Sequence, residues 1–151
     1  MLPISIIVPT KDREFYIKRL LSYYVKIEFD GFIYIGDSSC AKVVEATERF
    51  IKDIGSRINI IYRKYPNRNE ARTTKLLLDL VNTPYVVWSG DDDFLVPSGL
   101  KKCVEFLENN TNYHSANGKA IALDCTDTNN IRQSWEYIQP SIEGNNGSDR
   151  V

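Results

Sequence analysis

Ile4-Ser5-Ile6-Ile7-Val8-Pro9-Thr10 is the stretch that decides the fold. It is a short, β-branched apolar run that Pro9 interrupts and polar residues follow, and such a run predicts a buried strand. Four comparable runs follow, at residues 32–35, 58–62, 85–88 and 120–123. Their apolar residues are continuous rather than alternating, which favours strands covered on both faces, as in a parallel sheet.

Segments with helical periodicity separate these runs. Apolar residues recur at three- and four-residue intervals in residues 14–27 and 41–54, residues 69–81 read as a third helix, and a fourth begins at Pro97. Strands that alternate with helices predict an α/β domain of three layers, with a mostly parallel central sheet and helices on both faces. We expect this domain to cover residues 1–125, and residues 126–151 to be a polar tail or the start of a missing acceptor-binding part.

Composition restricts the function classes. The 151 residues suit one domain, and a net charge of -1 gives no sign of a nucleic-acid partner. The three cysteines form no CxxC pair, which favours reduced thiols in a cytoplasmic protein over a zinc site. The apolar run at residues 4–8 is too short for a membrane span.

Polar residues follow the predicted strands at their carboxyl ends, where open α/β sheets bind ligands. Thr10 and Asp12 follow the first strand, Asp37 the second, and Arg68 and Arg72 lie beyond the third. Thr10, Asp12 and Asp37 are candidates to bind a ligand, although each also suits a helix cap or a turn. The arginines are candidates to contact phosphate or are solvated.

Asp91-Asp92-Asp93, after the fourth strand, is the most informative motif. Adjacent carboxylates repel one another unless a cation lies among them, and hard oxygen ligands suit Mg²⁺ or Mn²⁺. Such an ion neutralises a diphosphate leaving group. The alternative is a solvated acidic turn that caps the next helix. The position of the motif, directly after an apolar strand, favours the metal site.

In these segments the chain resembles the family 2 glycosyltransferases, which have the Rossmann-like GT-A fold. The resemblance rests on residues 4–10, 35–39, 69–72, 85–93 and Pro97 in this order, over about the first hundred residues.

The resemblance implies a nucleoside diphosphate sugar as donor and Mg²⁺ or Mn²⁺ as cofactor. Thr10 and Asp37 match positions that hold the nucleoside, and Asp91 matches one near the ribose. Asp92 matches the metal-binding carboxylate of the DxD motif, and reading that motif from Asp91 makes Asp93 the ligand instead. The matching residues further include Arg72, which corresponds loosely to a family arginine.

The sequence also departs from the family pattern. Lys11 stands where many members have an aromatic residue, and Gly36 and Gly90 stand where many have the first Asp of a pair. The catalytic base of inverting members lies further downstream than this chain extends, so the catalytic residue, the acceptor and the stereochemical outcome stay unassigned. We therefore expect a fragment with a further domain beyond Val151, or a reduced protein.

Three rival functions stay open from the sequence. A sugar nucleotidyltransferase requires a glycine-rich loop after the first strand, and residues 10–13 contain no glycine. A non-catalytic nucleotide-binding module would keep the site without the acceptor half. A receiver domain requires an Asp after the third strand, where Arg63 and Lys64 stand.

Overall fold

The structure is a computed structural model that describes residues 1–124 and 133–137. Its central sheet has four parallel strands in the order β3-β2-β1-β4, namely β1 (Ile4–Thr10), β2 (Phe32–Asp37), β3 (Asn59–Lys64) and β4 (Tyr85–Trp88). The two central strands, β1 and β2, are buried along almost their whole length, whereas the edge strands β3 and β4 are only partly covered. The α/β class and the parallel sheet predicted from the sequence are confirmed.

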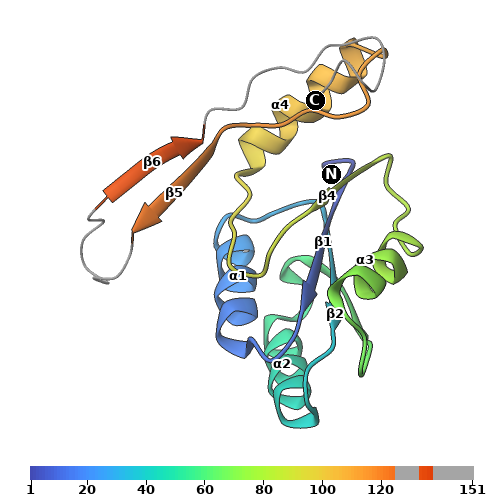
Figure 1. The fold of residues 1–151 in the computed structure, drawn as a ribbon, viewed down its shortest axis with the longest axis vertical. Coiled ribbons are helices and arrows are strands. Elements are labelled where there is room, and N and C mark those ends of the chain that lie inside the picture. Colours follow the sequence, from blue (N-terminus) through green and yellow to red (C-terminus); the bar gives the residue numbers. More distant parts are fainter. Residues whose placement is uncertain (125–132, 138–151) are drawn as a thin grey trace.

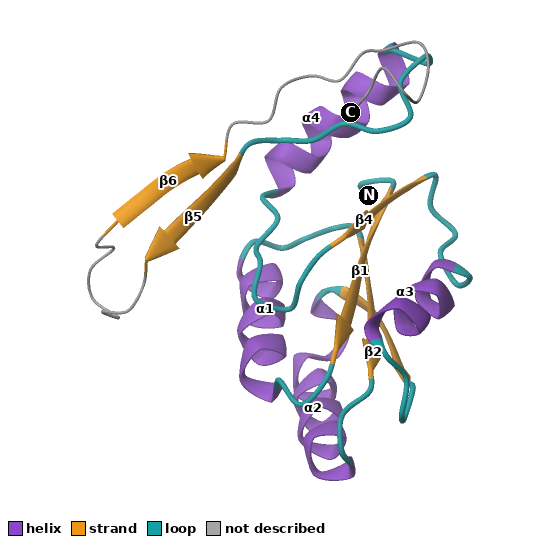
Figure 2. Ribbon diagram, in the orientation of Figure 1, coloured by secondary structure: helices purple, strands orange, loops and turns teal. Residues whose placement is uncertain are grey.

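Helices cover both faces of the sheet (Figure 1; Figure 2). α1 (Glu14–Lys26) and α2 (Ala41–Ile54) lie on one face, and α3 (Glu70–Leu78) lies on the other. Alternate residues of β1 separate the two layers, since Ile6 belongs to the large cluster with α1, and Ile7 packs with Leu77 of α3. The chain therefore forms the three predicted layers around two apolar cores.

The helix ends follow the local sequence. Asn69 caps α3, because its side chain accepts a hydrogen bond from the backbone N–H of Arg72 at 3.0 Å. Gly55 ends α2 with φ at 63°, and a short 3-10 turn (Gly55–Arg57) follows. α3 is shorter than predicted because Leu80 and Val81 donate to carbonyls three residues back, which tightens the chain and ends the helix.

α4 (Pro97–Asn109) begins at a proline and buries Leu100 and Val104 in the larger cluster. β5 (Ala120–Asp124) is the predicted fifth strand, but it pairs antiparallel with β6 (Gln133–Tyr137) in a separate two-stranded sheet. Apart from β6, the segment predicted to be a polar tail lies outside the described residues. Among the described helices, none is both long and apolar enough to cross a membrane.

Candidate functional site

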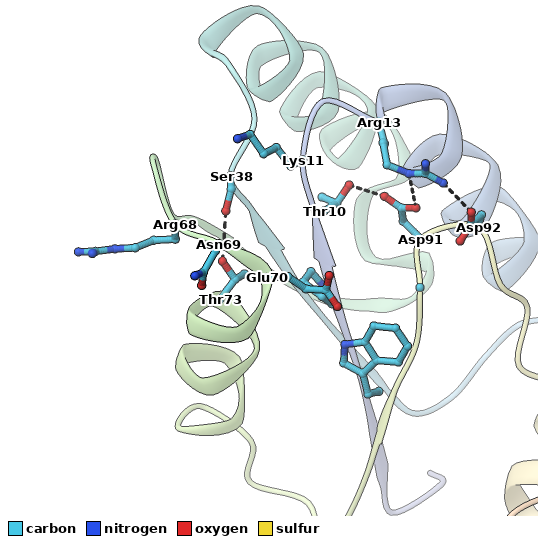
Figure 3. A pocket seen from close by; sticks show the side chains of 13 residues that line it. Thr10, Lys11, Arg13, Ser38, Arg68, Asn69, Glu70, Thr73, Asp91 and Asp92 are labelled. Carbon is cyan, nitrogen blue, oxygen red and sulfur yellow. Dashed lines mark hydrogen bonds and ion pairs between the residues drawn. The ribbon is translucent and has the colours of Figure 1, made fainter.

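A cavity of about 560 Å³ opens at the carboxyl edge of the sheet, beside the ends of β1, β2 and β4 and the start of α3 (Figure 3). Its walls come from four segments that are far apart in the sequence. They are Pro9, Thr10, Lys11 and Arg13; Ser38; Arg68, Asn69, Glu70 and Thr73; and Trp88, Gly90, Asp91 and Asp92. The strand ends therefore lie together at one edge, as predicted, and they surround a cavity in the surface.

Asp91 is the buried centre of a polar network that joins β1 to the turn after β4. Its side chain is 6% exposed, and both carboxylate oxygens accept hydrogen bonds. Thr10 Oγ1 donates to Oδ2 at 2.6 Å, and Arg13 Nε donates to Oδ1 at 2.7 Å. Burying a carboxylate is costly unless it is paired in this way. The contacts fix the acidic turn against the end of β1.

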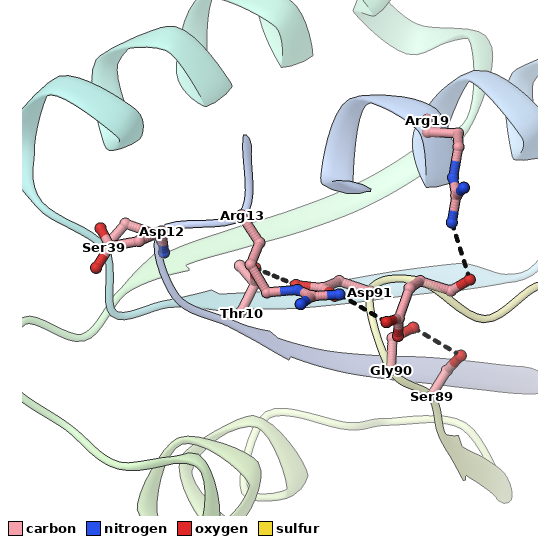
Figure 4. Close-up of polar contacts among 9 residues, drawn as sticks. Thr10, Asp12, Arg13, Arg19, Ser39, Ser89, Gly90 and Asp91 are labelled. Atoms are coloured by element: carbon pink, nitrogen blue, oxygen red, sulfur yellow. Dashed lines mark hydrogen bonds and ion pairs between the residues drawn. The ribbon is translucent and has the colours of Figure 1, made fainter. Parts of the chain in front are cut away.

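Asp92 lies beside Asp91 but faces solvent. Its side chain is 50% exposed, and Oδ2 accepts a hydrogen bond from Arg13 Nη2 at 2.6 Å. Its backbone carbonyl accepts a bond from Arg19 Nη2 at 3.1 Å (Figure 4). The same guanidinium of Arg13 thus contacts two consecutive aspartates, and its carbon lies 3.9 Å from the centre of the Tyr16 ring. The hydrogen bond to Asp91 raises the pKa of Arg13, so it stays charged.

At Gly90 two carboxylates of the acidic turn approach the backbone closely. A Cβ built on Gly90 would lie 2.9 Å from Asp92 Oδ1 and 3.1 Å from Asp93 Oδ2, so oxygens from two carboxylates point to the side that glycine leaves empty. Mg²⁺ and Mn²⁺ bind through one or two carboxylates and complete their shell with water and phosphate oxygens. Within residues 1–124 and 133–137 no cluster of three or more Asp, Glu, His or Cys side chains could hold an ion by itself. The residues fit an ion that is shared with a phosphate ligand.

The turn after β2 is built differently. Asp37 is 1% exposed, and its carboxylate accepts hydrogen bonds from the Ser39 backbone N–H at 2.8 Å and from the Tyr62 hydroxyl at 2.6 Å. Burial, and then the hydrogen bond to Asp37, raise the pKa of Tyr62 well above its usual range. Ser38, not Asp37, lines the cavity, and its hydroxyl lies 3.1 Å from that of Thr73 in α3.

Asp12 joins the start of α1 to the start of α2. Its backbone is in the left-handed region, with φ at 55°, which Asp tolerates better than most residues. Its carboxylate accepts a hydrogen bond from the Cys40 N–H at 2.9 Å, and its own N–H donates to Ser39 Oγ at 2.6 Å. These contacts tie the loop after β1 to the loop after β2 at the edge of the site.

Three of the residues predicted for the site form part of the cavity wall: Thr10, Asp91 and Asp92. The other four, Asp12, Asp37, Arg72 and Asp93, lie outside that wall. The backbone N–H of Arg72 completes the cap of α3, whereas Arg68 and Glu70 from the same region line the cavity.

Most of the wall residues were not among the predicted site residues, and Arg13 and Trp88 show why. Arg13 belongs to the polar run after β1, but nothing in its spacing shows that it pairs with an aspartate 78 residues away. Trp88 ends an apolar strand, and the sequence pattern interprets it as a core or half-buried aromatic. It is 49% exposed because β4 is an edge strand.

Solved structures share this fold. A mannosyltransferase from Pyrobaculum calidifontis, PcManGT, solved in complex with GDP-Man and Mn²⁺, is similar with a TM-score of 0.61 at 20% identity. The similarity covers 72% of this chain and 33% of that one. Residues 1–349 of TarS from S. aureus, in complex with UDP-GlcNAc, are similar with a TM-score of 0.54 at 21% identity, over 72% of this chain and 32% of that one. The chain thus spans about a third of the length of these structures.

No curated protein matches the chain in sequence. A family model does match, and it covers almost the whole chain, residues 5–148. It describes glycosyl transferase family 2, the family that the strand ends and the acidic turn resemble. The chain belongs to glycosyl transferase family 2.

Proposed function

We propose that this chain is the donor-binding part of a glycosyltransferase, which binds a nucleoside diphosphate sugar together with Mg²⁺ or Mn²⁺. One observation carries the proposal. Thr10 and Asp91, which are 81 residues apart in the sequence, meet at 2.6 Å in the wall of a cavity, with Asp92 beside them. A bound ligand there would contact the end of β1 and the acidic turn at the same time.

The cavity and Asp93, which lies just outside its wall, supply the groups that a nucleotide sugar requires. Asp92 and Asp93 would hold the cation, which neutralises the diphosphate as it leaves the sugar. Lys11 and Arg68 line the same cavity and provide positive charge for phosphate oxygens. We place the nucleoside near Thr10 and the turn that Asp37 supports, in keeping with the family positions. PcManGT with GDP-Man and TarS with UDP-GlcNAc are similar folds that hold such donors.

The proposal concerns the donor half of the reaction. An acceptor hydroxyl requires a general base within hydrogen-bond reach. Glu136, the one late carboxylate of the sequence whose side chain the structure describes, pairs with Lys119 at 2.8 Å on the surface of the β5–β6 hairpin. We therefore leave the catalytic base and the acceptor unassigned, and expect them in the part of the longer relatives that this chain does not span.

Calorimetry with the Asp92→Asn variant tests the proposal. The parent is titrated with UDP and with GDP, with and without Mn²⁺. We expect Mn²⁺ to strengthen the binding of one nucleotide to the parent. In the presence of Mn²⁺, Asp92→Asn should bind that nucleotide at least about tenfold more weakly than the parent, because the amide is a poorer cation ligand. Asp53→Asn, which removes an exposed carboxylate from α2, is the matched control and should bind as the parent does. Equal binding by the parent and Asp92→Asn would contradict the metal assignment.

A non-catalytic nucleotide-binding module is the second candidate, because the chain spans about a third of the structures it resembles. The two candidates differ in turnover. A donor-binding part of a glycosyltransferase supports release of nucleoside diphosphate from its donor once the part that carries the catalytic base is supplied, whereas a binding module does not. Nucleotide release from the donor that binds best, measured with Mn²⁺ present, distinguishes them.

A further inference from the structure

Arg13 occupies an unusual position in the proposed site. Its Nε donates to Asp91 Oδ1 at 2.7 Å, and its Nη2 donates to Asp92 Oδ2 at 2.6 Å. The two contacts differ in their surroundings, since the Asp91 side chain is 6% exposed and the Asp92 side chain is 50% exposed. One cation therefore contacts two adjacent carboxylates, Asp91 through a buried hydrogen bond and Asp92 through a solvated one.

The solvated contact is the weaker of the two. Exposed ion pairs contribute little because water screens them, whereas a charged hydrogen bond to a buried carboxylate is expensive to lose. Stacking on Tyr16 and the bond to Asp91 both hold the guanidinium in place. The Nη2 contact to Asp92 can therefore open while the Nε contact to Asp91 persists.

A divalent ion on Asp92 would compete with this contact. Both are cations that require the lone pairs of one half-exposed carboxylate, and they repel each other at short range. We infer that Arg13 is a built-in counter-ion, which holds Asp92 in place until a divalent ion takes over that carboxylate. Its released Nη2, in the cavity wall, then binds the phosphate oxygens of the donor. This role rests on the proposed function. It makes Arg13 a residue that positions the Asp92 carboxylate for the ion and binds the diphosphate directly.

The counter-ion role predicts opposite effects of Arg13→Gln on two ligands. With Mn²⁺ alone, we expect the variant to bind about three- to tenfold more tightly, because the competing cation is gone. With Mn²⁺ saturating, we expect UDP or GDP, whichever the parent prefers, to bind about tenfold more weakly, because a phosphate contact is lost. A residue that only stabilised the turn would weaken both ligands together. Calorimetry measures both affinities.

Arg19→Gln is the matched control. It also removes one positive charge beside the acidic turn, but Arg19 lies within α1, whereas Arg13 directly precedes that helix. Arg19 contacts the Asp92 backbone carbonyl and not its carboxylate. Its Mn²⁺ affinity should therefore stay within about twofold of the parent. Arg13→Lys provides a second variant that keeps the charge but not the forked geometry, and it should lie between the parent and Arg13→Gln for Mn²⁺.

The outcomes separate this inference from the proposed function. Unchanged or weaker Mn²⁺ binding by Arg13→Gln and Arg13→Lys, in a parent that binds Mn²⁺ and nucleotide, overturns the counter-ion role and leaves the proposed function standing. Equal gains in Arg13→Gln and Arg19→Gln show a general charge effect and also overturn it. A parent that binds neither Mn²⁺ nor nucleotide overturns both.

Discussion

Two turns that begin with an aspartate lie at the same edge of the sheet, and the two aspartates have different partners. Asp37, after β2, is buried, and its partners are neutral groups of the protein, the Ser39 N–H and the Tyr62 hydroxyl. Asp91, after β4, is also buried, but one of its partners is the cation Arg13. The residue after Asp37 is buried, whereas Asp92 is half-exposed.

This difference suggests that the turn after β2 stabilises the fold, whereas the turn after β4 binds a ligand. The turn after β2 carries a single carboxylate, Asp37, and each of its oxygens has a close donor from the protein. The turn after β4 carries more negative charge than Arg13 alone neutralises, since Asp91, Asp92 and Asp93 are consecutive. We therefore expect substitutions in the first turn to act mainly on stability, and substitutions in the second to act mainly on ligand binding.

The largest effect on stability should come from Asp37→Ala. The change leaves a buried backbone N–H and a half-buried hydroxyl without their acceptor, and the loss for a buried group costs roughly 1–3 kcal/mol. We expect the free energy of unfolding, measured by urea denaturation, to fall by about 3 kcal/mol. Asp37→Asn keeps one oxygen acceptor for the Ser39 N–H and should lose less. A loss below about 1 kcal/mol for Asp37→Ala would show that the carboxylate is not a structural element.

The layers of this fold were predictable because they depend on local patterns. The apolar runs that became β1 and β2 are central strands buried on both faces, and each predicted helix forms. The sequence pattern did not identify β4 as an edge strand, because its apolar run matches those of the central strands. Only the pairing order, with β1 on one side, leaves Val86 and Trp88 exposed.

The pairing of β5 was also not predictable from its composition. Ala120–Asp124 has the apolar content of a sheet strand, but it pairs with β6, from which eight residues separate it. Its Ile121 and Leu123 side chains are exposed rather than in the core of the parallel sheet. The choice between two sheets depends on which partner strand pairs with this segment, and a run of five residues does not encode its partner.

The candidate site was predictable in its location but not in its contacts. The strand ends placed Thr10 and Asp91 at one edge, and the register of β1 with β4 brings them together. The two contacts of Arg13, to Asp91 and to Asp92, depend on its side-chain conformation and on the turn at Asp12. Hydrophobic periodicity does not indicate the positive φ of Asp12. Residue type alone did not distinguish Arg13, which lines the cavity, from Arg72, which lies outside its wall.

A smaller effect, and one that depends on pH, should come from Tyr62→Phe. Near neutral pH the variant loses the hydrogen bond to Asp37, and we expect a loss of about 1 kcal/mol. The pKa of Tyr62 is raised in the folded chain, so above about pH 10 the unfolded chain loses this proton first. The stability that Tyr62 contributes is therefore complete below pH 10 and declines as the pH rises further.

Urea denaturation of the parent and Tyr62→Phe at pH 8, 10 and 11 measures this difference. The gap between the two proteins should narrow above pH 10. Tyr24, whose pKa is raised by burial, is present in both proteins, so its contribution to alkaline unfolding cancels in the comparison. A constant gap across these pH values would show that Tyr62 ionises normally in the folded chain and that the bond to Asp37 is weak.

The smallest effect on stability should come from Asp92→Asn, the same change that is expected to abolish the gain in affinity from Mn²⁺. Its carboxylate is half-exposed, and water screens its contact to Arg13. Removing one of three consecutive negative charges also relieves repulsion, so the two effects offset each other. We expect the free energy of unfolding without metal to change by no more than about 0.5 kcal/mol. Added Mn²⁺ should raise the melting temperature of the parent but not of the variant, because an ion stabilises only the state that binds it. A loss comparable to that of Asp37→Ala would show that both turns are structural, and it would remove the distinction between a completed turn and one that is open to a ligand.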